Sequence, residues 1–297
     1  MAIILGRNQY GKAEVRLVHI DRSTPVHRIR DITVSTALRG DFTDTHLYGD
    51  NSHVLATDTQ KNTIHAFARD GGIGEIEEFG LRLARHFAGS HEWVTGARVE
   101  ISEHGWRRID VGGRPHEHAF SSAGGEYRTT VVTVDHGAPY VVSGTAGLVV
   151  LKSTGSEFRG FARDKYTTLA ETDDRVLATE VTARWRYTDA EVEFGRLFPD
   201  IRTILLETFA EVHSRALQET LYAMGHRVLT AHAEVAEIRL SMPNRHHFPV
   251  DLSPFGLDNP GTVFEVADRP YGKIEGSVLR DDAPDEGPAW LAVPGFC

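Results

Sequence analysis

The segment ATDTQKNT, residues 56–63, carries hydroxyl, amide and charged side chains at a position where a helix is expected to start. Thr57 and Gln60 have the spacing of a capping box, in which two side chains accept hydrogen bonds from N–H groups of the first turn. The N–H groups of a first turn that stay unpaired favour anions. The segment therefore predicts a helix start that could bind a negatively charged ligand.

Two pairs of histidines raise the question of a metal site. His116 and His118 are two residues apart, so they would point the same way from a strand, and His246 precedes His247. The chain has 16 histidines, and no glutamate or third histidine stands at an obvious ligand spacing. We therefore interpret PHEHAF, residues 115–120, as a polar loop without a metal.

The segment GRNQYGKA, residues 6–13, matches most of a phosphate-binding GxxxxGK loop. Ala13 occupies the position where such a loop needs Ser or Thr for magnesium, and the following AEVRLVHI alternates like a strand. A phosphate-binding loop is therefore excluded.

Composition narrows the class of protein. The 297 residues include 42 Asp and Glu against 32 Lys and Arg, a net charge of −10, with the basic residues scattered, so nucleic acid is not expected as a partner. The single cysteine, Cys297, excludes an intrachain disulfide and a cysteine-built zinc site. No apolar run is long enough for a signal peptide or a membrane span, and we expect an intracellular protein without a membrane partner.

The elements that must position these residues alternate between strands and helices. Alternation predicts strands at residues 10–21 and 26–40, and again around residues 93–102 and 126–135, with a loop at 112–125. Helices are predicted at 59–69 and 75–89, the second with Phe79, Leu83 and Phe87 on one face. The first half thus has the order β-β-α-α-β-β.

The second half repeats this order. Strands are predicted at 139–154, 175–187, 231–242, 261–268 and 272–279, and one long helix at 201–229. We predict two α+β domains, 1–137 and 138–297, the second ending in an irregular tail from Ala283. Antiparallel sheets with one helical layer leave open edges, and pairing with neighbouring subunits would cover them, so oligomerisation is expected.

Six segments considered together resemble the urate oxidase (uricase) family over nearly the whole chain. They are YGK at 10–12, ATDTQKNT at 56–63, GGRPHEHAF at 112–120, LKSTGSEFRGFARDKYTTLAETDDRVLAT at 151–179, ALQETLY at 216–222 and MPNRHHF at 242–248. The resemblance implies a tandem T-fold, assembled as a homotetramer around a central tunnel. It also implies oxidation of urate by O2 to 5-hydroxyisourate and hydrogen peroxide in purine catabolism, with neither a metal nor an organic cofactor.

The resemblance also implies the residues that bind urate. Arg175 matches the arginine that grips one edge of the ring, where its planar fork can donate two parallel hydrogen bonds. Gln218 matches the amide at the opposite edge, and Leu217 contributes a backbone N–H where the family often has valine. Phe158 matches the aromatic ring on which the purine stacks.

Further residues implied by the resemblance lie around the ring. Asn244 matches an amide near the site of dioxygen or water, and the amides of Thr57 and Asp58 would reach the anionic five-membered ring.

Lys12, Thr57 and His246 match a proton relay. A hydroxyl is donor and acceptor at once, a partly buried amine can accept a proton, and an imidazole can change charge near neutral pH. If Thr57 relays protons, the helix cap falls to Asp58 or Thr59. The family shares each site between subunits, so Lys12 and Thr57 are expected from one chain and the remaining groups from its neighbour.

Two alternatives remain open at this stage. One is a metal-dependent T-fold pterin enzyme in which His116, His118 and a third group bind zinc. The other is a urate-binding barrel without catalysis. The chain does not end in the Ser-Lys-Leu peroxisomal signal of many eukaryotic relatives, so we expect a cytoplasmic location.

Overall fold

The computed structural model describes residues 1–291 and 293, so Cys297 lies outside the described residues. The chain forms two compact units. The first contains Met1–Gly144, Arg186–Gly195 and the described part of Pro284–Val293, and the second contains Thr145–Trp185 and Arg196–Ala283. The predicted division at residue 137 stays a prediction. Among the described residues, no helix is long and apolar enough to cross a membrane.

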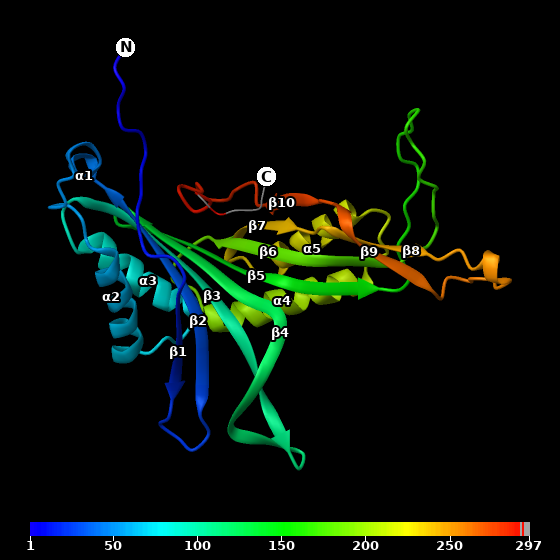
Figure 1. The fold of residues 1–297 in the computed structure, drawn as a ribbon, viewed down its shortest axis with the longest axis horizontal. Coiled ribbons are helices and arrows are strands. Elements are labelled where there is room, and N and C mark those ends of the chain that lie inside the picture. Colours follow the sequence, from blue (N-terminus) through cyan, green and yellow to red (C-terminus); the bar gives the residue numbers. More distant parts are fainter. Residues whose placement is uncertain (292, 294–297) are drawn as a thin grey trace. The chain divides into compact units, whose positions relative to one another are not determined.

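The first unit is built on antiparallel strands (Figure 1). In sheet order these are β1 (Val15–Asp21), β2 (Arg28–Gly40), β3 (Val94–Val111) and β4 (Arg114–Asp135), followed by the beginning of β5 (Ala138–Lys152). The register pairs Val15 with Val34 and Val34 with Ile101, so apolar residues of three strands line up on one face. The edge strand in this unit is β1.

Two helices cover the apolar face of these strands. Helix α2 (Thr57–Asp70) packs against β1, and α3 (Ile76–Gly89) packs against β3 and β4. Phe79, Leu83 and Phe87 of α3 are fully buried, which confirms the predicted helical face. The predicted α+β class with antiparallel strands and a helical layer is confirmed.

A buried ionic cluster holds the start of α3. Glu77 is completely buried, and Arg128 donates to both Glu77 and Glu75 over 2.6 Å, while the Ser143 hydroxyl donates to Glu77. Burial raises the pKa of Glu77, an effect that the charge of Arg128 opposes. The cluster satisfies a carboxylate that would otherwise be costly to bury.

The predicted loop at 112–125 is wrong. Strands β3 and β4 continue as a long hairpin that turns at Gly112 and Gly113, both with positive φ, and Arg108 pairs with Phe120. PHEHAF is therefore part of a strand. The short helix α1 (Thr43–Tyr48) was not predicted, and it has no buried residue that would create a periodic signal.

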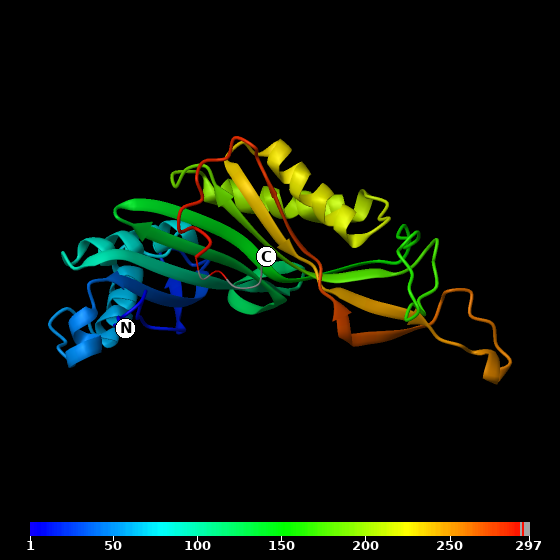
Figure 2. The same ribbon diagram turned by 90° about the horizontal axis from the view of Figure 1, so that it is seen from above.

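The second unit continues β5 with β6 (Leu177–Tyr187), β7 (Val235–Ser241) and the edge strand β10 (Glu275–Leu279). Off this path, β8 (Asn244–Pro249) pairs with β6 and with β9 (Phe264–Gly272), and a short 3-10 helix follows at Ser253–Phe255. Helices α4 (Phe194–Glu211) and α5 (Leu217–Ala231), yellow-green and yellow in Figure 2, lie on one face of these strands.

The prediction of a single long helix at 201–229 is wrong, because the helix is interrupted between the end of α4 at Glu211 and the start of α5 at Leu217. Lys152 donates from Nζ to the carbonyl of Val212, and the N–H of Ser214 donates to Gly155 over 2.9 Å. These bonds turn the backbone at 212–216 toward the chain that follows β5. As a result, Leu217 and Gln218 stand at the start of a helix and not in its middle.

Candidate active site

The first unit contains Lys12, Thr57 and Asp58, and backbone contacts tie Lys12 to helix α2. The N–H of Lys12 donates to the Thr36 hydroxyl over 3.2 Å, and its carbonyl accepts from the Thr36 N–H over 2.8 Å. The same hydroxyl donates to Gln60 of α2 over 2.7 Å. Gly11 allows this approach, since a Cβ there would lie 1.8 Å from the Thr36 oxygen. The YGK motif therefore fixes the main chain of Lys12.

The capping box predicted for Thr57 and Gln60 is wrong. The N-cap of α2 is Ala56, without a side-chain cap, and Thr57 is the first helical residue. Gln60 is fully buried and bonds inward to Thr36 and to the Leu55 carbonyl. The alternative caps are also wrong, because Asp58 bonds to Lys61 and Asn62 and the Thr59 side chain makes no cap bond.

The unused donors of this helix start fit an anion. The first intrahelical bond of α2 runs from the N–H of Gln60 to the carbonyl of Ala56, so the N–H groups of Thr57 and Asp58 precede the hydrogen-bonded turn. Within the described residues the Thr57 hydroxyl makes no hydrogen bond. Both the amides and the hydroxyl are thus available to a ligand, as the sequence predicts.

In the second unit, the loop between β5 and β6 (green in Figure 1) holds Phe158 and Arg175. Phe158 forms a two-bond bridge with Thr172, at 2.9 and 3.1 Å, which fixes its backbone. Its ring stacks on Phe161, with centroids 5.0 Å apart and an angle of 14° between the planes. The Arg175 guanidinium carbon lies 5.1 Å from the Phe158 ring centre. An aromatic face and a cation therefore meet at one place.

Arg175 does not form a surface ion pair with Asp173 or Asp174, the two aspartates that precede it. Asp174 accepts from the Thr154 hydroxyl over 2.7 Å and from the Gly155 N–H over 3.0 Å, while Asp173 pairs with Arg159. No carboxylate among the described residues pairs with the Arg175 guanidinium, and burial lowers its pKa. A partly desolvated, uncompensated guanidinium is suited to bind an anion.

Leu217 and Gln218 begin α5 in the same way as Thr57 and Asp58 begin α2. The N-cap is Ala216, again without a side-chain cap, and the first bonds to its carbonyl come from Glu219 and Thr220. The N–H groups of Leu217 and Gln218 therefore precede the bonded turn. The Leu217 side chain is buried, and the Gln218 side chain is exposed without a hydrogen bond among the described residues.

Asn244 and His246 lie on β8. Asn244 is 9% exposed and pairs in register with Thr179 of β6 and Gly272 of β9, and an irregularity in the β8–β9 register separates it from His246. Burial lowers the pKa of His246, and the positive charge of Arg175 lowers it further. The lowered pKa favours the neutral imidazole, which has a ring nitrogen free to accept a proton.

The nine predicted site residues thus fall into two groups. Lys12, Thr57 and Asp58 belong to the first unit, whereas Phe158, Arg175, Leu217, Gln218, Asn244 and His246 belong to the second. Each group combines the start of a helix with a chemically active side chain. Each group also supplies donors that its own unit leaves unused.

Comparison with known proteins identifies the family. The sequence model of the Uricase family matches residues 8–133 and 141–275. The chain belongs to the uricase family. It is 54% identical to the uricase of Arthrobacter globiformis over 295 residues, which cover 99% of this chain and 96% of that protein. It is 39% identical to the uricase of Dictyostelium discoideum over 92% of this chain and 96% of the relative.

Solved structures agree with this assignment. The crystal structure of the Arthrobacter globiformis uricase superposes with a TM-score of 0.94 at 53% identity and covers 98% of this chain and 99% of that one. The crystal structure of the urate oxidase of Bacillus sp. TB-90 superposes with a TM-score of 0.81 at 24% identity, over 92% of this chain and 100% of that one. At this identity the similarity supports the fold alone. The predicted family resemblance and the T-fold of the uricase family are confirmed.

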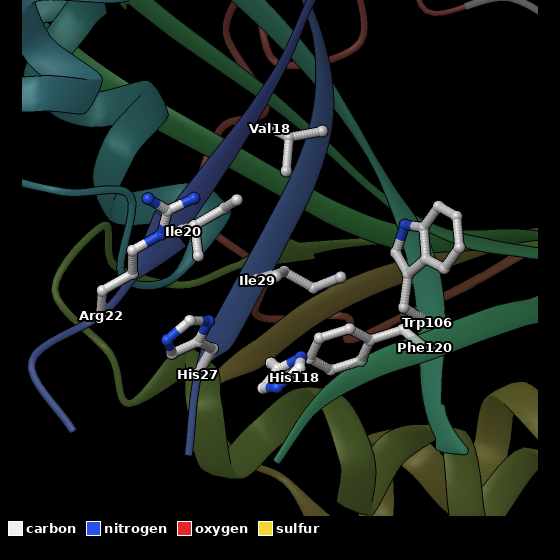
Figure 3. Close-up of a pocket in the computed structure, with 8 residues that line it drawn as sticks. All are labelled: Val18, Ile20, Arg22, His27, Ile29, Trp106, His118 and Phe120. Carbon is white, nitrogen blue, oxygen red and sulfur yellow. The ribbon is translucent and has the colours of Figure 1, made fainter. Parts of the chain in front are cut away.

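A separate pocket lies in the first unit, and none of the nine predicted site residues lines it. It has a volume of about 470 Å³. His27 and His118 line it together with Ile20, Ile29 and Phe120 (Figure 3). His118 and His116 are in ring contact at 4.6 Å, but no group of three metal-binding side chains occurs among the described residues.

The supporting roles of the residues that hold the site residues in place were not predicted from the sequence. Thr36 and Gln60 support Lys12, and Ser156 and Ser214 support Arg175 and the start of α5. Ser156 lies inside a segment that carries the uricase resemblance, yet serine in a loop gives no periodic signal. Its complete burial and its two hydrogen bonds with Arg175 identify it as a structural partner.

Proposed function

We propose that this chain oxidises urate with O2 to 5-hydroxyisourate and hydrogen peroxide, consuming one water molecule. Urate oxidation in purine catabolism is the activity of the family to which the chain belongs. The observation that carries the assignment to these residues is Arg175. Its guanidinium has no carboxylate partner among the described residues and lies against the face of Phe158.

Each binding residue meets a different part of the purine. Phe158 offers a face for the flat ring, and Arg175 donates two parallel hydrogen bonds to an oxygen and a nitrogen on one edge. The Gln218 amide and the Leu217 N–H take the opposite edge, while the N–H groups of Thr57 and Asp58 stabilise the anionic five-membered ring. The ligand would supply acceptors for two helix starts that lack caps.

Proton transfer makes the urate ring electron-rich enough to reduce O2 without a metal or an organic cofactor. Lys12 and Thr57 remove and relay a proton. Burial lowers the pKa of His246 and so favours the neutral imidazole, whose free ring nitrogen can accept a proton. Urate then gives two electrons to O2, which takes up two protons to become hydrogen peroxide. Water adds to the oxidised ring to complete 5-hydroxyisourate, and Asn244 holds the water or the dioxygen.

The assembly is a homotetramer around a central tunnel, with each site shared between two chains. Support comes from the open edge strands β1 and β10 and from the distribution of the site residues over two compact units. Gel filtration and activity at increasing dilution test this directly, since a demonstrably monomeric sample should retain its circular dichroism and lose turnover. Turnover by the monomer would refute site sharing. The cytoplasmic location stays a prediction.

The decisive experiment compares two arginines of one loop. Arg175→Gln should lower kcat/KM for urate about 100-fold or more, because two charge-assisted hydrogen bonds are lost. Arg159→Gln, which alters an exposed arginine paired with Asp173, should change it less than twofold. The assay follows urate absorbance with chelator-treated enzyme in air. Equal activity of both variants would refute the binding assignment, and a complete need for added metal would refute cofactor independence.

A further inference from the structure

Ser156 occupies a completely buried position beneath Arg175. Its hydroxyl accepts a hydrogen bond from Nε of Arg175 over 3.3 Å, and its carbonyl accepts from the backbone N–H of Arg175 over 2.8 Å. One residue thus holds both the main chain and the side chain of this arginine. The serine is 0% exposed, so no water replaces its hydroxyl from the solvent side.

The Nε bond determines which donors of Arg175 are left for a ligand. A guanidinium has five N–H donors in a rigid plane, one on Nε and four on the two Nη atoms. With Nε engaged by Ser156, only the Nη donors remain for a ligand. The plane of the guanidinium is fixed, because rotation about the Cδ–Nε bond would break the hydrogen bond to the Ser156 hydroxyl. The arginine therefore presents its Nη fork in one orientation.

Ser156 also connects Arg175 to the opposite edge of the site. Ser156 and Ser214 form a parallel backbone bridge, and the Ser214 N–H and carbonyl bond to the neighbours Gly155 and Glu157, over 2.9 and 2.8 Å. Ser214 is fully buried and lies three residues before α5 begins at Leu217. The pair of serines therefore sets the distance between the Arg175 fork and the start of α5.

We propose that Ser156 is a positioning residue for urate binding, which acts through Arg175 by engaging Nε and directing the Nη fork at the purine edge. The proposal rests on the proposed function, because it requires that Arg175 grips urate. It predicts that loss of the serine hydroxyl weakens substrate binding more than it slows the chemical steps. Ser156 itself does not touch the substrate.

The test is a double-mutant cycle on urate affinity, measured by anaerobic calorimetric titration so that no turnover occurs. Ser156→Ala should raise the Kd of urate about tenfold, the scale of a hydrogen bond to a charged group, with a smaller change in kcat. In the Arg175→Gln background the same change should have no effect. Ser143→Ala is the matched control, because it removes another fully buried serine hydroxyl bonded to a charged group, Glu77, in the other unit. Its Kd should match that of the wild type even if its Tm falls.

The outcomes distinguish a failure of the Ser156 role from a failure of the Arg175 role. If Ser156→Ala leaves Kd unchanged, or weakens binding equally with and without Arg175, the positioning role is refuted. If Arg175→Gln itself binds urate like the wild type, the proposed function of Arg175 fails instead. Should Ser156→Ala not fold, Ser156→Cys keeps the volume and offers only a weak acceptor, so the same rise in Kd and the same dependence on Arg175 are required.

Discussion

The contacts around Thr36 predict a specific pattern of stability in the first unit. Its hydroxyl receives the N–H of Lys12 and donates to Gln60, which is fully buried and also donates to the Leu55 carbonyl. Leu55 keeps a second partner, since the Tyr10 hydroxyl donates to the same carbonyl over 3.2 Å. The two side chains therefore differ in what they leave unpaired when removed.

The magnitudes follow from counting these groups. Thr36→Val leaves the Gln60 amide oxygen and the Lys12 N–H without partners, at roughly 1–3 kcal/mol each, so the free energy of unfolding should fall by about 3 kcal/mol. Gln60→Leu removes two neutral hydrogen bonds but strands no group, which costs about 2 kcal/mol. The double variant should lose only about 3 kcal/mol, because replacing both partners removes the orphaned oxygen.

Urea unfolding at one fixed protein concentration, followed by circular dichroism, measures these free energies. The coupling of about 2 kcal/mol between the substitutions is the expected result. Turnover is a second measurement. Thr36→Val should lower kcat about tenfold, because the backbone of Lys12 loses a hydrogen bond that holds it in place. Additive losses, or a Thr36→Val variant as stable as the wild type, would refute the reasoning.

Three other outcomes are expected from single side chains. Thr57→Val should lower kcat about 100-fold, because the proton relay is lost. The free energy of unfolding should change by less than about 0.5 kcal/mol, since the Thr57 hydroxyl has no partner among the described residues. A matched loss of stability would contradict the relay role. Burial lowers the pKa of His246, and the charge of Arg175 lowers it further. Activity that needs the neutral imidazole should therefore fall on acidification at a pH below the ordinary pKa of histidine, and His246→Gln should remove this acid limb from the profile of kcat/KM against pH. Gly80→Ala would place a Cβ 2.8 Å from Val132 and should cost about 1–3 kcal/mol by urea unfolding, whereas Gly89→Ala meets nothing within 4 Å and should not destabilise α3.

Elements with one buried face could be predicted from the sequence. Helix α3 buries Phe79, Leu83 and Phe87 on one side, and β2 alternates at Ile32 and Val34, so periodicity reveals both. The extended β3–β4 hairpin could not be predicted in this way. Its outer part has no buried residue, so it lacks the apolar alternation that reveals a strand, although its backbone pairs in register.

Contacts between distant segments account for the other errors. Residues 212–216 continue the helical pattern of apolar side chains, but Lys152 and Gly155 bind their backbone and end α4. Gln60 has the local spacing of a cap, and its burial against Thr36 turns it away. Local patterns contain neither interaction. The site residues were predicted from family motifs, while their supporting residues required three-dimensional contacts.

The alanine N-caps of α2 and α5 imply a conflict between stability and affinity in this protein. Alanine is a poor N-cap, and Ser or Asp at such positions commonly adds about 1 kcal/mol to stability. Replacing Ala56 or Ala216 by Asp would therefore be a natural choice for engineering a more heat-resistant protein. In the proposed site the same carboxylate would accept the N–H groups that urate needs and would repel its negative charge. In that site the substrate would act as the missing cap, and thermostabilisation at these two positions would be achieved at the expense of substrate binding.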